Sequence, residues 1–322
     1  MRAQETYTFP AQARERRGAR LLKEARKSRT LLIMCVPAII FFAVFAYLPM
    51  PGLYLAFIRY DYGLGIFRSP FVGFDNFKFL VLSGDLWRLT FNTIAYNLAF
   101  IVFGNLLQIF VAVLMNELRL KWFKKLSQTI MFLPHFISAV LVGLLAYNFL
   151  SYEYGLLNSF LTSVGMEPVK TYSNPAIWPF IIVITYLWQS TGYGSIVYFA
   201  AIMGLDSEIV EAAEIDGANS WQRIRYIILP HLKPTFIILF LFALGGVLRG
   251  NFGLFYNLVG ANNTMLYETT DIIETFVFRS LMNNFNFSLG SAVSLYQSVF
   301  GFFIILTANW LVRKVSPENA LF

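Results

Sequence analysis

Two triplets of side chains combine aromatic rings with a polar or charged group inside apolar surroundings. The three residues of each triplet lie at positions i, i+3 and i+7. The first triplet is Tyr186, Gln189 and Tyr193, and the second is Arg249, Phe252 and Tyr256. Such spacing places the members of a triplet on one face of a helix. Aromatic rings stack on the C–H faces of sugars and amides bond their hydroxyls, so these residues suit the recognition of a sugar.

Arg249 adds a positive charge to the second triplet. An unpaired arginine in hydrocarbon costs at least ~2.5 kcal/mol, so Arg249 should face a wet cavity or a partner. Its guanidinium can hold a uronate carboxylate through paired charge-assisted hydrogen bonds, which favours an acidic oligosaccharide. Four glycines around it predict local unwinding of the span: Gly245, Gly246, Gly250 and Gly253. Together these features predict a segment that lines a solute pathway.

Both triplets also have purely structural interpretations. Gln189 would join two neighbouring helices by a hydrogen bond within a packed bundle. Arg249 would pair with helix carbonyls, or with an acid of a partner subunit, and hold a broken helix together. The residues alone leave these alternatives open.

The chain offers little for catalysis or metal binding. Cys35 is the single cysteine, and His135 and His231 are isolated from each other, which argues against a metal site. A Gly-Lys pair does not occur in the sequence, so a P-loop for ATP is absent. The acids outside the apolar runs form no recognisable catalytic set: Asp61, Asp75, Asp85 and Glu153. We therefore predict no catalytic residue, no metal and no cofactor bound by this chain.

Membrane-spanning helices must position these side chains. The chain has 57% hydrophobic and 13% charged residues and a mean hydropathy of +0.59, which is not the composition of a soluble globular protein. Continuous apolar runs are long enough to predict six spans. We expect them at Leu31–Phe57, Thr90–Met115, Gln128–Leu150, Ala176–Gly204, Thr235–Val259 and Gly290–Val312.

The positions of the basic residues predict the orientation of these spans. Eighteen of the 25 Lys and Arg residues fall in segments on one side of the predicted membrane, namely 1–30, 116–127, the loop 204–234 and the residues after the sixth predicted span, 313–322. Since Lys and Arg concentrate in cytoplasmic loops, both termini should lie in the cytoplasm. The net charge of +7 then reflects orientation and contact with anionic lipid, so we expect no nucleic-acid partner.

A polar segment between the fourth and fifth spans carries the most specific pattern of the chain. Residues 211–230 read EAAEIDGANSWQRIRYIILP and match E-A-A, three residues, Gly, nine residues, then I-x-L-P. The fixed positions are filled by Glu211, Ala212, Ala213, Gly217, Ile227, Leu229 and Pro230. The pattern resembles the cytoplasmic EAA loop of ABC-importer permeases.

Elementary helix rules predict the shape of this loop. Asp206 can cap a first helix, and Gly217 supplies a backbone conformation that ends it. A second helix is expected from about Ser220 to Ile228, and Pro230 is expected to break the chain before the next span. The result is a helix–turn–helix knob between spans. An ordinary amphipathic interfacial loop is the alternative, but it gives no reason for Gly and L-P at these spacings.

Two further regions resemble permeases for complex oligosaccharides. The outer loop 58–89 contains FVGFDNFKFL (71–80) and is followed by FNT (91–93), an element seen after the first span in permeases of oligosaccharide importers. The late segments ALGGVLRGNFGLFYNL (243–258) and TTDIIETFVFR (269–279) are similar to LplB-like permeases, associated with alginate, aldouronate and rhamnogalacturonan fragments. The first loop is expected to form a packed cap over the outer mouth, although an aromatic belt at the membrane interface would use some of the same residues.

The resemblance implies an all-α polytopic protein with the six-helix type I ABC-importer (MetI-like) fold. Its domains would be a basic cytoplasmic arm (1–30), a six-span permease domain (31–315) with the cap loop 58–89 and the coupling loop 204–234, and a cytoplasmic tail (316–322).

The implied function is the permease subunit of a binding-protein-dependent ABC importer of an oligosaccharide. The implied partners are a second homologous permease in a heterodimer, two ATPase subunits that hold ATP and Mg, an extracytoplasmic binding protein and the bilayer. The alternatives are a permease for a neutral oligosaccharide or another solute, an ion-coupled secondary transporter, for which the apolar cores lack Asp and Glu, and a membrane enzyme.

Overall fold

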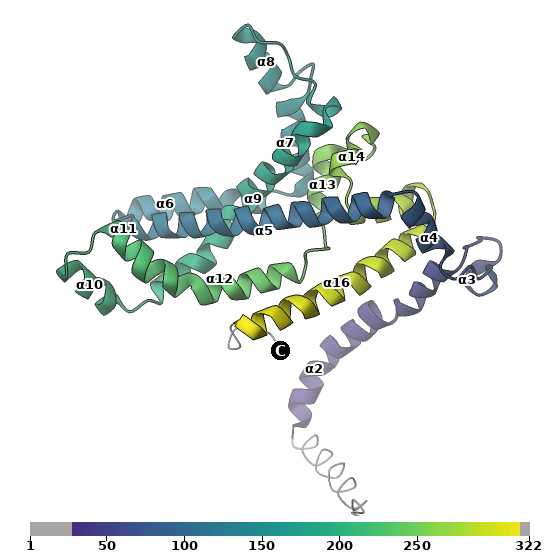
Figure 1. Ribbon diagram of the computed structural model, residues 1–322, viewed down its shortest axis with the longest axis horizontal. Coiled ribbons are helices and arrows are strands. Elements are labelled where there is room, and N and C mark those ends of the chain that lie inside the picture. The colour runs from purple at the N-terminus through teal and green to yellow at the C-terminus, as the bar shows by residue number, and fades with distance from the viewer. Residues whose placement is uncertain (1–27, 316–322) are drawn as a thin grey trace, which may run out of the picture. The chain divides into compact units, whose positions relative to one another are not determined.

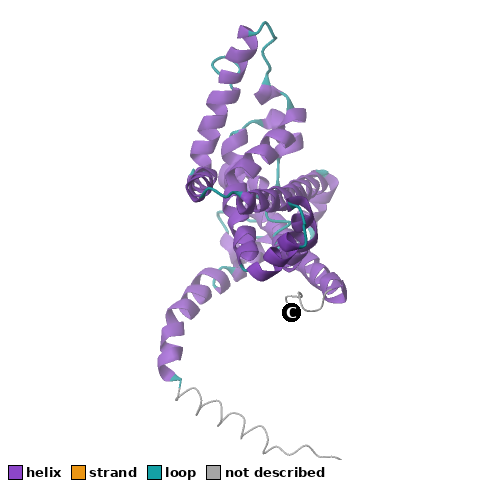
Figure 2. Ribbon diagram, turned by 90° about the vertical axis from the view of Figure 1, so that its left-hand side faces the viewer, coloured by secondary structure: helices purple, strands orange, loops and turns teal. Residues whose placement is uncertain are grey.

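The computed structural model describes residues 28–315, and helices make up most of that part of the chain (Figure 1, Figure 2). The long helices are α2 (Arg29–Phe42), α5 (Asp85–Glu117), α6 (Lys121–Phe132), α7 (Ala139–Leu150), α9 (Trp178–Met203), α12 (Leu229–Leu244) and α16 (Phe287–Val315). The short helices are α3 (Gly65–Arg68), α4 (Asp75–Leu82), α8 (Leu156–Ser163), α10 (Ser207–Ile215), α11 (Ser220–Arg223), α13 (Phe252–Val259), α14 (Tyr267–Thr270) and α15 (Ile273–Phe278). The all-α prediction is confirmed for the described residues.

The chain divides into two units, residues 1–54 and 55–322. The described part of the first unit holds α2 and a π-helical turn, Ala43–Tyr47. With the 3-10 run Met50–Phe57, they form one candidate span. The predicted basic arm falls almost wholly outside the described residues, as does the predicted tail 316–322.

Most of the predicted spans coincide with long apolar helices. Within residues 28–315, five helical stretches are long and apolar enough to cross a membrane, and a bent pair of helices makes up to six. The first, second, fourth and sixth predictions fall on Arg29–Phe57, Asp85–Glu117, Pro175–Met203 and Phe287–Lys314. These four spans could be predicted from the sequence because a sufficiently long apolar run identifies a candidate span.

The third predicted span falls on a sharply bent pair of helices. Helices α6 and α7 lie on either side of a short 3-10 turn, Leu133–Phe136, and the two halves meet at 96°. Pro134 lies in the first turn of this 3-10 segment, where its missing N–H is tolerated. Ser138 then starts α7, because its hydroxyl accepts a hydrogen bond from the Leu141 N–H.

The fifth span lies earlier in the chain than we predicted. It is a continuous helical stretch, Ser220–Leu244, made of α11, a π-helical turn (Ile224–Ile228) and α12. Pro230 was predicted to break the chain but sits in the first turn of α12, directly after the π-helical turn. This turn changes the hydrogen-bond register before the proline, so the helix continues past it. The predicted range Thr235–Val259 is therefore wrong: the chain leaves the helix after Leu244 and starts the separate helix α13 at Phe252.

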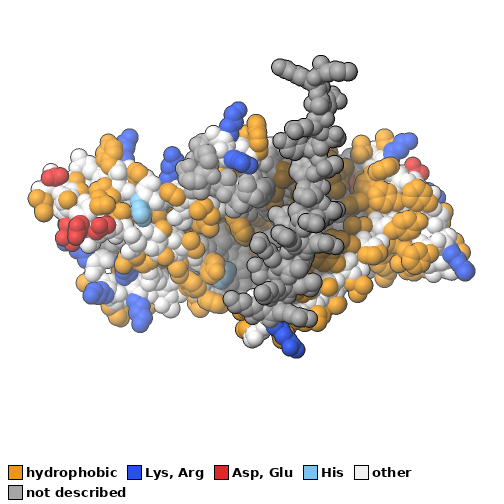
Figure 3. Space-filling model, turned by 90° about the horizontal axis from the view of Figure 1, so that it is seen from below, with side chains coloured by type: hydrophobic (Ala, Val, Ile, Leu, Met, Phe, Trp, Pro, Cys, Tyr) orange, Lys and Arg blue, Asp and Glu red, His pale blue; other side chains and the backbone are white. Residues whose placement is uncertain are grey.

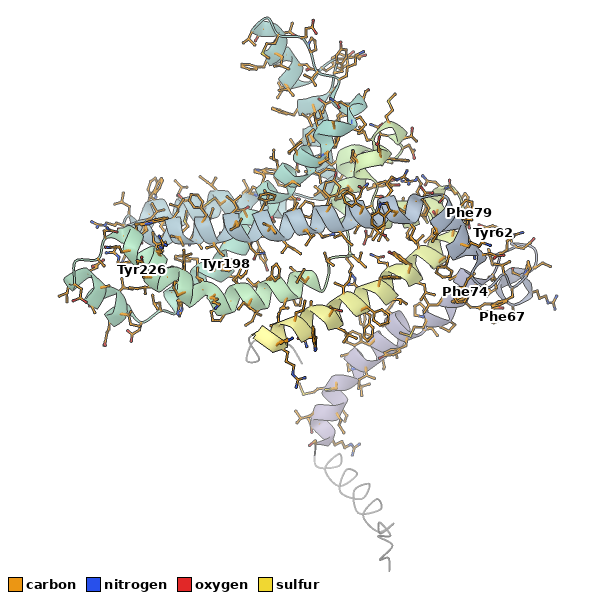
Figure 4. The ribbon with its side chains drawn as sticks, viewed as in Figure 1. Tyr62, Phe67, Phe74, Phe79, Tyr198 and Tyr226 are labelled. Atoms are coloured by element: carbon orange, nitrogen blue, oxygen red, sulfur yellow. The ribbon has the colours of Figure 1, made fainter. Side chains whose placement is uncertain are left out.

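The second unit is built around the crossing of α5 and α9. At its inner end, Ala112 and Val113 of α5 pack with Tyr198 and Ile202 of α9 and with Leu232 of α12. Figure 4 shows Tyr198 between these helices, and its hydroxyl bonds to Asn105 of α5. A neighbouring cluster joins α5, α7, α9 and α13 through Tyr96, Phe100, Val142, Trp178 and Phe255. The crossing thus holds the middle of the bundle together.

Gly192 allows the bent span to approach α9. A β-carbon placed on Gly192 would lie 1.8 Å from the Met131 carbonyl oxygen, so any side chain there would push α6 away. Close helix approach through small residues is the usual means of packing helices inside a membrane. This glycine sits one residue before Tyr193, and it brings α6 beside the first triplet.

The outer loop after the first span is a compact cap. The Asn76 side chain donates to the carbonyls of Ala56 and Ile58, and Ile58 forms an antiparallel bridge with Phe71. Phe74 packs on the rings of Phe57 and Phe77. Figure 4 shows the aromatic side chains of this loop gathered at the end of α5 opposite to Tyr226.

Large apolar side chains remain exposed along the long helices of the second unit. Figure 3 shows apolar side chains spread over much of one face, while acidic and basic groups gather near α10 and α11 at its left-hand end. Phe103 and Phe110 of α5, Phe242 of α12 and Phe302 of α16 are all more than half exposed. A lipid bilayer is the surrounding that such a surface requires.

Candidate functional site

A polar pocket of about 380 Å³ lies where α5, α9 and the two helix breaks meet. Its walls are Gln108, His135, Tyr186, Gln189, Ser190, Tyr193, Gly194 and Asn251. Gln108 comes from α5, and His135 from the break in the third span. Asn251 comes from the break after α12. The first predicted triplet is therefore brought together in one cavity with polar groups from three other segments.

Aromatic stacking fixes two sides of this pocket. Tyr186 lies on the ring of Phe100, with centroids 3.9 Å apart and planes 17° apart. Tyr193 lies on the imidazole of His135, with centroids 4.3 Å apart and planes 9° apart. Both tyrosines therefore have one ring face covered, and both line the pocket, which suits contact with a sugar.

Gln189 holds the break in the third span. Its amide donates a 2.8 Å hydrogen bond to the carbonyl of Ile137, which lies between the 3-10 turn and α7. Carbonyls freed by a helix break need a donor inside the bilayer. The structural interpretation of Gln189 is therefore present in the structure, and the same side chain also lines the pocket. The role of this triplet in transport stays a prediction.

A second set of side chains holds the break after α12. Glu274 of α15 accepts a 2.6 Å hydrogen bond from the Gly250 N–H and another of 2.6 Å from the Gln297 amide. Gln297 also donates to the Leu248 carbonyl at 2.6 Å. Burial raises the pKa of Glu274, and the two hydrogen bonds and the charge of Arg249 oppose this shift. We call Glu274 and Gln297 the clasp.

The clasp holds the segment that carries Asn251 into the pocket. Asn251 caps α13 by accepting from the Leu254 N–H at 3.1 Å, and its side chain also lines the cavity. Since Gly250 is the preceding residue, the hydrogen bond from its N–H to Glu274 fixes where Asn251 points. The clasp thus joins α15 and α16 to the wall of the pocket.

The second predicted triplet is not brought together as one face of a helix. Arg249 lies in the irregular segment before α13, where it is exposed, and it lies outside the walls of the pocket. Phe252 and Tyr256 stack on each other at 5.0 Å and both contact the ring of Phe278. The expected single helical face is wrong because the glycine-rich segment unwinds between Arg249 and Phe252. The proposed roles of these residues stay predictions.

The outer ends of the helices are tied together by buried polar contacts. Asn92 donates to the carbonyls of Glu268 and Asp271, and Thr93 accepts from the Ile273 N–H. The Asp271 carboxylate is buried, and Arg279 binds it through both terminal nitrogens, at 2.7 and 3.2 Å. The Asn-Thr pair that the sequence singled out therefore anchors the segment that leads into α15.

The knob formed by α10 and α11 has the predicted helix–turn–helix form. Asp206 caps α10 by accepting from the Glu208 N–H at 3.0 Å, and Gly217 has a φ of 82°. Asn219 and Gln222 form a capping box that starts α11. Figure 1 shows α10 and α11 at one end of α5, with α4 at the other. Only the expected stop at Pro230 fails.

The fixed positions of the pattern divide into an exposed surface and a support. Glu211, Ala212 and Gly217 are exposed, and Ala213 is half-buried beside the turn. Ile227 is half-buried, while Leu229 and Pro230 remain exposed where the helix enters the span. The neighbouring Ile228 enters the inner core. A helix that exposes Glu211 and Ala212 above a packed base is suited to contact another protein.

Sequence reasoning missed several residues that shape the pocket. Gln108 and Asn251 stand inside apolar or glycine-rich stretches, and Glu274 lies outside the ranges predicted as spans. The segment 269–279 stands out in the sequence only through its similarity to LplB-like permeases. Polar residues within apolar runs are the signal that points to Gln108 and Gln297. No sequence pattern identifies Glu274, because its partners are the backbone N–H of Gly250, 24 residues earlier, and the side chain of Gln297, 23 residues later.

Comparisons with known proteins agree on one family. Residues 104–317 match the family described as binding-protein-dependent transport system inner membrane component. The chain is 30% identical to protein LplB of Bacillus subtilis (strain 168), over 94% of either chain. It is 32% identical to the polygalacturonan/rhamnogalacturonan transport system permease YteP of the same organism, over 93% of this chain and 92% of YteP.

The fold matches that of a solved transporter. A chain of a bacterial ABC transporter that imports the acidic polysaccharide alginate superposes with a TM-score of 0.83 at 34% identity. The match covers 92% of this chain and 99% of that one. A second crystal structure shows that transporter in complex with an alginate pentasaccharide-bound periplasmic protein. The predicted type I importer fold is thereby confirmed.

The clasp generates a prediction about stability. Glu274→Ala should leave the Gly250 N–H without its acceptor and the Gln297 amide with only the Leu248 carbonyl; a buried group left unsatisfied costs about 1–3 kcal/mol. We expect a lower midpoint of thermal unfolding in detergent. Glu274→Gln is the control, because its amide oxygen can still accept from Gly250. Equal midpoints for Glu274→Ala and the wild type would contradict the role of the clasp.

Proposed function

The chain belongs to the family of binding-protein-dependent transport system inner membrane components, and on this basis we propose that it forms one half of the translocation pathway of an oligosaccharide importer. As a transport component it is not an enzyme, and ATP would be bound, with Mg, by separate subunits. The single observation that carries the proposal is that the chain has both an exposed EAA knob and a polar pocket at two helix breaks. Transporters bind solutes at such interrupted helices.

The knob is the proposed contact with the ATPase. Its first helix presents Glu211, Ala212 and the turn at Gly217, and small side chains let another protein approach closely. In the second unit the knob and the cap loop lie at opposite ends of α5 (Figure 4). With the basic residues on the knob side, the termini and the knob would be cytoplasmic and the cap extracytoplasmic.

The pocket is the proposed pathway. Tyr186, Gln189 and Tyr193 would meet the solute from α9, and Asn251 would meet it from the break after α12. Arg249, Phe252 and Tyr256 flank that break and are proposed as further pathway residues. The pocket walls carry amides, hydroxyls and aromatic rings, which is the chemistry that binds sugar hydroxyls and ring faces.

An acidic oligosaccharide is the proposed solute. The solved relative imports alginate, and YteP is named for polygalacturonan and rhamnogalacturonan. Arg249 is an exposed cation two residues before Asn251, which lines the pocket. A carboxylate would gain charge-assisted hydrogen bonds there that a neutral hydroxyl cannot match. A neutral oligosaccharide, the alternative solute, would bind in the pocket without a contact to Arg249.

The proposed assembly contains several further chains. A second, different permease would complete the pathway, two ATPase subunits would each accept one knob, and a binding protein would deliver the sugar at the outer mouth. The complex of the alginate transporter with its periplasmic protein supports the last of these partners. The exposed apolar helices support contact with lipid.

A first prediction concerns the knob. Gly217→Pro cannot adopt the φ of 82° and should distort the turn, while Glu211→Lys reverses the charge of the exposed helix. Either change should leave the chain in the membrane but remove binding-protein-stimulated ATP hydrolysis by the purified complex, or detach the ATPase. Gly217→Asn is the control, since asparagine tolerates a positive φ. Normal stimulated hydrolysis in both variants would refute the proposed contact.

A second prediction concerns the charge of the sugar. Arg249→Gln should lower the uptake of an alginate oligosaccharide roughly tenfold or more, as expected for loss of a hydrogen bond to a charged group. Uptake of the carboxyl-reduced neutral counterpart should change little. Arg249→Lys keeps the charge and should fall in between. An equal loss for both sugars would make Arg249 a structural residue and leave the acidic sugar unsupported.

A further inference from the structure

Arg223 connects the knob to the inner end of α5. Its Nη1 lies 2.7 Å from a carboxylate oxygen of Glu214 on α10, and its Nη2 lies 3.8 Å from one of Glu117, the last residue of α5. Nη2 also donates to the Ser220 hydroxyl at 3.2 Å. The Arg223 side chain is 15% exposed, so it is largely enclosed by these groups.

Local structure fixes the direction of the Arg223 side chain. The capping box of Asn219 and Gln222 sets the first turn of α11, and Arg223 is the last residue of that short helix. A planar guanidinium carries donors that diverge, so one arginine can face two acids at once. Among the described residues, the other ion pairs lie at the outer end, around Asp85 and Asp271. Within residues 28–315, the ion pairs of Arg223 are therefore those that join α10 and α11 to the end of α5.

The helix that Arg223 reaches extends to the opposite side of the bundle. Helix α5 has 33 residues, which corresponds to about 50 Å at 1.5 Å per residue. At its outer end, Asn92, Thr93 and Tyr96 are hydrogen-bonded to the segment that leads into α15. Gln108 of the same helix lines the pocket. A displacement of α5 would therefore reach both the pocket and the outer tether.

Chain connections join the knob to two spans. Helix α9 leads into α10, and α11 continues into α12, so a movement of the knob passes directly to α9 and α12. Helix α5 has no such chain connection to the knob. It contacts the knob through Arg223, and it is joined to α9 and α12 by the packing of Ala112 and Val113 and by the hydrogen bond between Asn105 and Tyr198.

We propose that Arg223 is a positioning residue that makes α10 and α5 move as one body when the ATPase closes. The proposal rests on the proposed contact of the knob with an ATPase. Without Arg223, the knob would still move α9 and α12, but α5 would follow only through its contacts with these two helices and would have no direct ion pair with the knob. ATP hydrolysis by the ATPase subunits would then be poorly coupled to movement of the pathway.

The test measures the distance between α10 and α5 in the assembled complex. Spin labels are placed on Ser207→Cys of α10 and Leu114→Cys of α5 in a Cys35→Ala background, and pulsed electron resonance is recorded without nucleotide and after ATP–vanadate trapping. With Arg223 present, we expect one narrow distance that trapping leaves unchanged. With Arg223→Gln, we expect a broader distribution that shifts on trapping. Arg225→Gln is the matched control, because it removes a charge from the neighbouring turn without removing these pairs.

Glu117→Gln tests the route through α5. Added to Arg223→Gln, it should broaden the distribution no further, because both changes remove the same link. Equal distances in Arg223→Gln and the Arg225→Gln control would overturn the proposal while leaving the knob contact intact. If no ATPase subunit copurifies with the unaltered chain, the proposed function fails and the role of Arg223 fails with it.

Discussion

The structure depends on one constraint: backbone N–H and C=O groups freed inside a bilayer must find partners from the protein. In the described residues the helical backbone breaks at Leu133–Phe136, within the bent pair α6 and α7, and again after Leu244, where the fifth span ends. Gln189 supplies the donor for the Ile137 carbonyl at the first interruption. Glu274 and Gln297 supply the acceptor and donor for Gly250 and Leu248 at the second. Without these side chains, both breaks would be costly in hydrocarbon.

The same polar groups make the interior of the bundle useful for transport. Side chains that stabilise the breaks come from α9, α15 and α16, so each break is bonded to a helix distant in sequence. His135 and Asn251, which belong to the breaks themselves, face one pocket with Gln189. A pathway lined by interrupted helices can change shape through small rotations of the segments on either side. Structural and transport roles of Gln189 are therefore compatible.

Much of the fold was predictable because apolar length and the EAA pattern are local properties of the sequence. Asp206 and Gly217 define the knob through capping and a positive φ, and both act on immediate neighbours. The fifth span was misplaced because Pro230 was expected to stop a helix that a π-helical turn carries past it. The clasp was missed because Glu274 acts on Gly250, a contact that depends on tertiary structure. Gln189 and the tyrosines beside it were found because helical spacing already placed them on one face.

The central claim is that the two breaks line a water-filled path through the membrane. The most direct test is thiol labelling of single cysteines at Tyr193 and Asn251, in a Cys35→Ala background of the assembled complex, with an impermeant reagent applied from either side. Both positions should label from one side without nucleotide and from the opposite side after ATP–vanadate trapping, whereas a cysteine at the exposed Phe242 of α12 should not label. Protection of both positions from both sides in every state, as at Phe242, would contradict the account.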